Sequence, residues 1–280
     1  MPRRVRLREL LVGVEGLALL RGLYDDTPED ADKRLSEVRH VLEDGSFAAE
    51  ELTSETDPRT GYGLWAATYG RHGNPIIALE QSFVWPILDT IPRGRALDGA
   101  CGTGRHARYL ADLGHEVVGV DVTAGMLDRA RTNVPEANFI EADMREIPCE
   151  DQAFDAVVCA LALAHLEDLS PPVAELARVL RSGGRMVISV LHPFQALLGW
   201  QAPFADAIGR RSFVREHPHT HAEYFAAFVA SRLRVRDCVE PRLTDELIRS
   251  KRRAFTHIPE ATRAAYAGLP AVLVWDLEKQ

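Results

Sequence analysis

The chain has 280 residues, of which 46% are hydrophobic and 26% charged, and its formal net charge is -8. These values suit a soluble globular protein with either one domain of about 200 residues and an extension, or two small domains. Basic residues are scattered in short groups, which argues against nucleic acid as a partner, and no stretch is apolar for long enough to span a membrane. The four cysteines lie far apart without a C-x-x-C pair, as expected for reduced thiols in the cytoplasm.

The first 60 residues contain two predicted helices. The first has apolar residues at helical spacing, namely Leu7, Leu10, Leu11, Val14 and Leu17. The second begins where Thr27 can cap and Pro28 can occupy the first helical position, and Gly45 can end it. We therefore expect a helical extension over 1–60, which serves either as a packing element or homodimer contact, or as a lid over a ligand.

From residue 94 onward, strand patterns alternate with helix patterns, which is typical of a parallel sheet covered on both faces. Seven segments are predicted to be strands: 95–99, 115–121, 137–143, 154–162, 184–192, 233–241 and 270–278. The sequence thus predicts an α/β fold over 61–280, a doubly wound, seven-stranded, Rossmann-like sheet. Segments 193–230 and 241–268 are expected to be insertions, largely helical.

A glycine-rich turn follows the first of these strands. The segment "GTGRHA", 102–107, matches the dinucleotide fingerprint G-x-G-x-x-(G/A), and Asp121 ends the next strand 19 positions after Gly102. Glycines allow the backbone to approach a ligand closely, and an acid at this place can accept hydrogen bonds from ribose hydroxyls. The pattern predicts binding of a nucleoside-bearing ligand, with a purely structural turn as the alternative.

Two further acids help to distinguish between possible ligands. Asp98 precedes the glycines, where a negative charge is unfavourable for a pyrophosphate and favourable for a cationic amine. Asp143 follows the third strand and could accept from the exocyclic amine of adenine. Three acids, one each for an ammonium, a ribose and an adenine, match the groups of S-adenosylmethionine better than those of NAD.

With these motifs, the sequence resembles the class I S-adenosylmethionine-dependent methyltransferases, in particular their small-molecule branch. "LDGACGTG" is similar to the first motif of the family, "VVGVDVTAGMLDRAR" to the second, and "EADMREIPCEDQAFDAVVCALALAHL" to the third and fourth. "ELARVLRSGGRMVIS" is similar to the segment leading into the fifth strand, and the resemblance extends over about residues 60 to 240.

The resemblance implies a cofactor site. Asp98 and the backbone of Ala100 and Gly102 would hold the methionine end of S-adenosylmethionine, Asp121 the ribose, and Asp143 with Met144 the adenine. Tyr69 resembles an aromatic residue that closes over the cofactor, and the remaining expected cofactor contacts are Gly104, Val122, Met126 and Ala160. Ala100 departs from the family, because it occupies the place of the first glycine; we expect it to be tolerated if it avoids a positive φ.

Two histidines are candidates for the catalytic base, because removal of a proton from a hydroxyl near neutral pH suits imidazole. His165 lies just after the fourth predicted strand and His192 just after the fifth, so both should reach the carboxyl edge of the sheet. Either could instead only form hydrogen bonds within a loop.

The segment "EHPHTHAEY" contains His217, His219 and His221 in alternation. No fourth ligand accompanies them, so no metal site is expected; His219 and His221 are instead candidates for the acceptor pocket. An aromatic wall is expected from Trp65, Phe194 and Tyr224, and in addition from Trp200 and Phe204, although aromatic residues more often pack in a core.

The sequence therefore predicts a cytoplasmic methyltransferase. It would transfer a methyl group from S-adenosylmethionine to oxygen, nitrogen or an electron-rich carbon of a small molecule, and resemblance to bacterial tailoring enzymes suggests a natural product. Two alternatives are an NAD(P)-dependent oxidoreductase and a catalytically silent, cofactor-binding regulatory subunit.

Overall fold

The computed structural model describes residues 2–70 and 74–280. It divides the chain into two compact units. One unit combines Met1–Glu55 with Arg242–Pro270, and the other combines Thr56–Pro241 with Ala271–Gln280. The sequence did not indicate that the late segment joins the N-terminal one.

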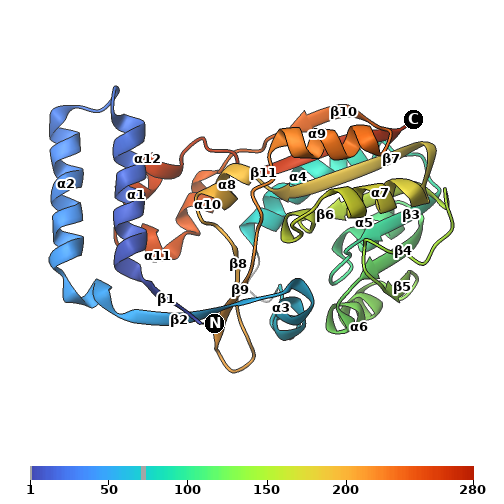
Figure 1. Cartoon of the computed structure of the whole chain (residues 1–280), viewed down its shortest axis with the longest axis horizontal. Helices are drawn as coiled ribbons and strands as arrows, with labels where there is room; N and C mark the ends of the chain where they lie inside the picture. The colour runs from blue at the N-terminus through green and yellow to red at the C-terminus, as the bar shows by residue number, and fades with distance from the viewer. Residues whose placement is uncertain (1, 71–73) are drawn as a thin grey trace. The chain divides into compact units, whose positions relative to one another are not determined.

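The smaller unit contains the two helices expected near the N-terminus, α1 (Leu7–Gly22) and α2 (Pro28–Glu43), which contact each other (Figure 1). Thr27 caps α2, since its hydroxyl accepts a hydrogen bond from the backbone N–H of Asp30. The unit also has two antiparallel strands, so residues 1–60 are not purely helical. Its other elements are β1 (Arg3–Arg6), β2 (Glu50–Thr56), η1 (Gly45–Ala48), α10 (Asp245–Arg249), α11 (Arg252–Phe255) and α12 (Pro259–Tyr266).

The larger unit is built on a seven-stranded sheet, and all seven predicted strands are present. Their order is β10-β11-β7-β6-β3-β4-β5. The five strands from β7 to β5 are parallel, whereas β11 is antiparallel to both β7 and β10. The strands are β3 (Arg95–Gly99), β4 (Glu116–Asp121), β5 (Asn138–Glu141), β6 (Phe154–Ala160), β7 (Leu180–Leu191), β10 (Leu233–Val239) and β11 (Val272–Lys279).

Helices cover both faces of this sheet. In Figure 1, α7 and α9 lie on the near face and α4 on the far face, where it contacts β7 and β11. The segment 193–230 also contributes a short antiparallel pair, β8 (Ala202–Ala205) and β9 (Arg211–Val214). The helices are α3 (Pro58–Trp65), α4 (Pro75–Leu88), α5 (Arg105–Asp112), α6 (Ala124–Asn133), η2 (Leu163–His165), α7 (Ser170–Val179), α8 (Pro193–Leu197) and α9 (His221–Ala230).

The core lies on the central strands, whose side chains are almost continuously apolar, as buried parallel strands require. On the α9 side, Trp275 of β11 contacts Tyr224 and Phe228, with ring centroids 6.3 and 5.3 Å away. Tyr224 is only 1% exposed. It therefore packs in the core, and the expectation that it lines an acceptor pocket is wrong in this structure.

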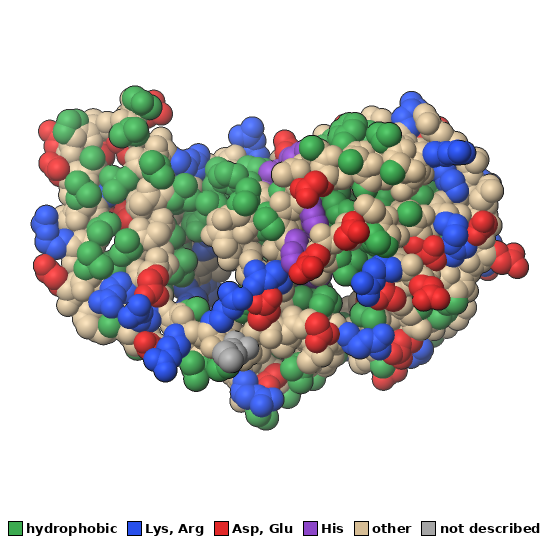
Figure 2. Space-filling view, in the orientation of Figure 1, with side chains coloured by type: hydrophobic (Ala, Val, Ile, Leu, Met, Phe, Trp, Pro, Cys, Tyr) green, Lys and Arg blue, Asp and Glu red, His purple; other side chains and the backbone are tan. Residues whose placement is uncertain are grey.

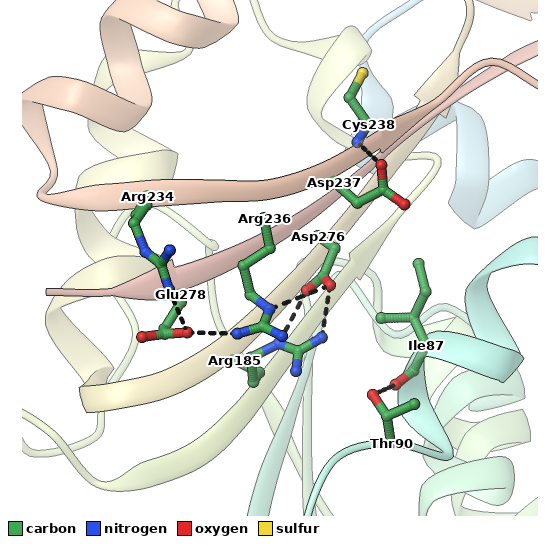
Figure 3. Close-up of polar contacts among 9 residues, drawn as sticks. All are labelled: Ile87, Thr90, Arg185, Arg234, Arg236, Asp237, Cys238, Asp276 and Glu278. Carbon is green, nitrogen blue, oxygen red and sulfur yellow. Dashed lines mark hydrogen bonds and ion pairs between the residues drawn. The ribbon is translucent and has the colours of Figure 1, made fainter.

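Charged pairs join the three strands at the antiparallel end of the sheet (Figure 3). Arg185 of β7 holds Asp276 of β11 through two hydrogen bonds of 3.0 and 2.6 Å. Glu278 of β11 accepts from Arg234 and Arg236 of β10. Opposite charges on adjacent strands stabilise pairing, so this group favours the observed strand order.

This topology brings the carboxyl ends of β3, β4, β6 and β7 to one edge. Ligands of doubly wound folds bind at such an edge, so the site is sought there. None of the helices in residues 2–70 and 74–280 combines the length and apolar character needed to cross a membrane.

Candidate functional site

The glycine turn leaves β3 and enters α5 through three residues with positive φ. These are Ala100 (φ 61), Gly102 (φ 54) and Gly104 (φ 81). A Cβ on Gly102 would meet no atom within 4 Å, so open space adjoins this position, whereas a Cβ on Gly104 would lie 3.2 Å from Val134. Ala100 does not meet the condition under which we expected it to be tolerated: its φ is positive, as a glycine's could be, at a cost of about 1 kcal/mol or more.

Asp121 at the end of β4 ties this turn to the next one. Its carboxylate accepts hydrogen bonds of 2.8 Å from the backbone N–H groups of Gly102 and Thr123. Burial raises the pKa of Asp121, against the opposing effect of these hydrogen bonds. The N–H of Gly102 is therefore already used within the chain, while each carboxylate oxygen of Asp121 keeps a lone pair for a ribose hydroxyl.

Asp98 lies at the end of β3, almost completely buried. Its carboxylate accepts one hydrogen bond, 2.8 Å, from the backbone N–H of Ala107 in α5. Burial raises the pKa of Asp98 to about 7, and the positive charge of Arg105 partly offsets this effect. A buried carboxyl with one hydrogen bond and a raised pKa suits a ligand that brings its own positive charge, such as the ammonium group of an amino acid.

A buried glutamate behind the turn was missed in the sequence. Glu80 of α4 accepts hydrogen bonds from Arg105 at 2.5 Å, from His106 at 3.2 Å and from Ser189 at 2.7 Å. Burial acts to raise the pKa of Glu80, but His106, Arg105 and Ser189 hold it at about 2. Glu80 thereby fixes the guanidinium of Arg105, whose positive charge acts on Asp98.

The adenine acid, Asp143, is paired in this structure. Its two carboxylate oxygens accept from Arg145 at 3.0 and 2.6 Å, and this pairing lowers the pKa of Asp143. Met144, Ala160 and Val122 are half-buried at the same edge. Met126 is only 1% exposed inside α6, so it packs in the core and presents no surface to a ligand.

Aromatic side chains gather next to the cofactor residues. Trp65 lies between Tyr62 and Phe204, with near-parallel rings and centroid distances of 5.6 and 5.4 Å. The ring centroid of Tyr69 lies 5.0 Å from that of Trp65. Burial raises the pKa of the Tyr69 hydroxyl; the charge of Arg105 opposes this shift and the charge of Asp121 adds to it. The structure thus brings together Trp65 and Tyr69, which the sequence singled out, with Tyr62, which it did not.

His165, in η2 after β6, is held by hydrogen bonds on both sides of its ring. Its Nδ1 lies 2.7 Å from the carbonyl oxygen of Arg215, and its Nε2 lies 2.8 Å from the hydroxyl of Tyr62. A carbonyl only accepts, so Nδ1 carries the proton and Nε2 offers its lone pair to Tyr62. The carboxylate of Glu216 lies 3.8 Å from the same Nε2.

Two hydrogen bonds attach the segment after β9 to η2 and to the residue that follows it. The backbone N–H of His217 donates to the carbonyl of Ala164 at 2.6 Å, and the ring of His219 donates to the carbonyl of Leu166 at 2.7 Å. His219 is therefore buried and structurally engaged beside His165. These bonds explain why Arg215 and Glu216 meet the histidine.

His192 lies elsewhere along the edge. Its Nδ1 accepts from the backbone N–H of Phe194 at 3.1 Å, and its Nε2 lies 3.0 Å from Glu240, which also contacts His221 at 2.9 Å. Histidine side chains reach the surface beside acidic ones near α9 (Figure 2). The backbone donor places the proton of neutral His192 on Nε2, so a metal ion there would require loss of this proton and of the bond to Phe194.

The exposed aromatic residue Phe194 belongs to α8, which His192 caps. Trp200 follows α8, and its backbone N–H donates to the carbonyl of Gln195. Neither is among the aromatic contacts that Trp65 makes. Of the residues expected to form the acceptor wall, Trp65 and Phe204 therefore lie together, beside Tyr62 and Tyr69.

The fold is that of an α/β enzyme, and its three acids lie where an adenosyl amino acid could bind, at the carboxyl edge of the sheet. Comparisons with known proteins show the family. Residues 97–188 match the model of a methyltransferase domain. A demethylmenaquinone methyltransferase of Beutenbergia cavernae is 31% identical over 171 residues, which cover 55% of this chain and 71% of that protein.

Other relatives are matched over less of their length. A malonyl-[acyl-carrier protein] O-methyltransferase of Enterobacter lignolyticus is 38% identical over 133 residues, 46% of this chain and 51% of that protein. Among solved structures, an S-adenosylmethionine-dependent methyltransferase from Mesorhizobium loti has a TM-score of 0.54 at 24% identity, over 72% of this chain and 100% of that one. This last likeness shows the fold.

The chain belongs to the S-adenosylmethionine-dependent methyltransferases. It is an enzyme whose cofactor is S-adenosylmethionine. The nicotinamide-dependent and catalytically silent alternatives have no support.

Proposed function

We propose that the acceptor binds beside Tyr62, Trp65 and His165, and that His165 is the final acceptor of the proton that the acceptor loses. The observation that carries this proposal is the pair of hydrogen bonds to His165. The carbonyl of Arg215 fixes the Nδ1–H tautomer, which leaves the basic Nε2 directed toward Tyr62. A base held in one tautomer by a buried partner is ready to take up a proton.

S-adenosylmethionine supplies a methyl group that its sulfonium already activates for in-line attack. The residues of this chain then have two tasks, which are to align the acceptor and to remove its proton. Asp98, Asp121 and the fixed guanidinium of Arg105 hold the cofactor. The half-buried rings of Tyr62, Trp65 and Tyr69 give the acceptor apolar neighbours, and Phe204 supports Trp65 from inside the fold.

His192 is assigned to positioning instead of catalysis. Both of its ring nitrogens are engaged, one at the N-terminus of α8 and the other at Glu240. Burial lowers the pKa of His192, although Glu240 opposes this effect. A neutral ring with both nitrogens occupied is well placed to fix the segment after β7 and poorly placed to accept a proton from a substrate.

The aromatic surface supports an aromatic or otherwise flat acceptor of the natural-product type. One relative is named for demethylmenaquinone and another for malonyl-[acyl-carrier protein]. The stacked rings of Tyr62, Trp65 and Phe204 favour the first kind of molecule over the second.

The test is transfer of labelled methyl from S-adenosylmethionine to three sets of acceptors: hydroxyaromatics, amines and carboxylic acids. Transfer should occur, and His165→Gln should lower it at least about 100-fold at pH 7. The matched control is His217→Gln, because no hydrogen bond of that ring occurs among the described residues. Equal activity of the two variants would contradict the role of His165.

A further inference from the structure

We propose that Tyr62 is the catalytic residue that contacts the acceptor, and that it takes a hydroxyl proton from the acceptor while passing its own proton to His165. Glu216 then stabilises the protonated ring. This inference rests on the proposed function, since it requires His165 to be the final proton acceptor. It also specifies the acceptor, which must carry an ionisable hydroxyl, as a phenol or a hydroquinone does.

The hydrogen bonds of His165 leave no other direct route. Neutral imidazole has one lone pair in the ring plane, and on His165 it faces the hydroxyl of Tyr62 at 2.8 Å. The opposite nitrogen is blocked by the carbonyl of Arg215. An acceptor can therefore reach His165 only through the oxygen of Tyr62, which retains lone pairs of its own.

Tyr62 is suited to pass on a proton and unsuited to act as a free base. Burial raises the pKa of Tyr62 well above its ordinary value, and the nearby hydroxyl of Tyr69 and the charges of Glu216 and Asp121 add to this effect. The hydroxyl therefore stays protonated near neutral pH, so it can take a proton only while it donates one.

Glu216 completes the arrangement. It is 9% exposed, and among the residues that the structure describes none donates a hydrogen bond to its carboxylate. Burial raises the pKa of Glu216, and the charge of His165 opposes this. Because the Glu216 carboxylate lies 3.8 Å from Nε2, its negative charge stabilises the His165 ring most strongly once that nitrogen is protonated.

Methyl transfer and proton transfer together break and form the following bonds. The O–H bond of the acceptor breaks, and the electron pair freed on the acceptor, at oxygen or at a conjugated ring carbon, forms the bond to the methyl carbon. The bond between that methyl and sulfur breaks with its pair remaining on sulfur. The proton of the acceptor goes to the oxygen of Tyr62, and the former proton of Tyr62 goes to Nε2 of His165. If the ring carbon was attacked, its own proton leaves afterwards to solvent.

The relay predicts selectivity for the acceptor. A carboxylic acid is already ionised near neutral pH and gains nothing from proton removal, whereas a phenol with a pKa of about 10 gains most. The half-buried rings of Tyr62, Trp65 and Tyr69 give such a ring apolar neighbours. We therefore expect hydroxyaromatics to be methylated and aromatic carboxylates of equal size to be poor acceptors.

The experiment uses 1-naphthol, 1,4-naphthohydroquinone and naphthols made more acidic by electron-withdrawing groups, with naphthoate as the carboxylate. For the full-length enzyme, Tyr62→Phe should lower kcat/KM for 1-naphthol about 100-fold at pH 7. The loss should shrink toward the most acidic naphthol, and also as the pH approaches the pKa of the acceptor. Tyr109→Phe is the matched control, since its hydroxyl donates to Asp89 in a different part of the unit.

Glu216→Gln should lower kcat/KM for 1-naphthol about tenfold, with a smaller loss for the more acidic naphthols. It should also move the acid limb of the pH profile to lower pH and leave the affinity for S-adenosylhomocysteine unchanged. A nitrogen-detected NMR spectrum of the S-adenosylhomocysteine complex should show His165 with its proton on Nδ1. A proton on Nε2, or a loss in Tyr62→Phe that is equal for all acceptors, would overturn the relay.

The failures can be told apart. Transfer to amines with none to naphthols overturns the relay and leaves the proposed function standing. Transfer to carboxylates alone contradicts the role of His165 as well, because a carboxylate has no proton to lose. Transfer to no acceptor of any of the three classes contradicts the proposed function itself. Transfer to naphthols that Tyr62→Phe leaves intact supports the acceptor class and removes Tyr62 from the chemistry.

Discussion

Binding of S-adenosylhomocysteine should release a proton from Asp98. With a pKa of about 7, this carboxyl is protonated in roughly three quarters of the molecules at pH 6.5. The ammonium of the ligand favours the ionised form, so binding at pH 6.5 should release about 0.7 proton, and the affinity should fall about tenfold between pH 8 and pH 6. Because burial raises the pKa of Asp98, the same group stabilises the ligand-free fold at low pH, and this contribution is lost as the pH rises through about 7.

The assay is isothermal titration calorimetry in buffers with different enthalpies of ionisation. The observed heat should change linearly with the buffer enthalpy, and the slope gives the number of protons released. Asp98→Asn should remove the slope. Asp143→Asn is the control, because pairing with Arg145 lowers the pKa of Asp143 and leaves it ionised at pH 6.5. A slope of zero in the wild-type protein, or an unchanged slope in Asp98→Asn, would refute the assignment of Asp98 to the ammonium.

Three other substitutions test the site and its support. Asp121→Ala should weaken S-adenosylhomocysteine binding at least tenfold, about 1.4 kcal/mol, because two charge-assisted hydrogen bonds to the ribose are lost; unchanged affinity in a folded variant would contradict this. Ala100→Gly should raise the free energy of unfolding by about 1 kcal/mol in urea titrations, since φ is 61 in the native state, and a decrease would show that no strain is stored there. Asp276→Ala should lower the free energy of unfolding by about 3 kcal/mol by leaving Arg185 buried without its partner, while ligand affinity is retained; a loss below about 1 kcal/mol would place this pair among weak surface pairs.

The sheet could be predicted from the sequence because its signals are local. Buried parallel strands are continuous apolar segments, and each of the seven is bounded by glycine, proline or charged residues within a few positions. The reversal of β11 leaves no such trace, since an apolar strand reads alike in either direction. Nor did the sequence indicate that Arg242–Pro270 joins Met1–Glu55, because that association depends on contacts between segments about 200 residues apart.

The cofactor acids were found because each ends a strand, and strand ends are visible in the sequence. Glu80 was missed because it lies in the middle of α4, where a glutamate usually faces solvent. Its partners Arg105, His106 and Ser189 come from two other elements, so only the folded chain shows that it is buried and paired. Tyr62 and Glu216 were missed for the same reason; the available signal was an acid within the histidine segment, one residue before His217.

The two candidate histidines show where residue type and strand position stop being informative. His165 and His192 both follow a central strand and both reach the carboxyl edge. At Nδ1, however, the partner of His165 is a hydrogen-bond acceptor and the partner of His192 is a donor. A carbonyl accepts from Nδ1 of His165 and leaves Nε2 basic, whereas a backbone N–H donates to Nδ1 of His192 and leaves Nε2 protonated. One main-chain group therefore decides which ring can take up a proton. That group belongs to Arg215 in the first case, 50 residues away, and to Phe194 in the second, two residues away. The capping geometry of α8 was thus within reach of sequence reasoning, and the tautomer of His165 was not.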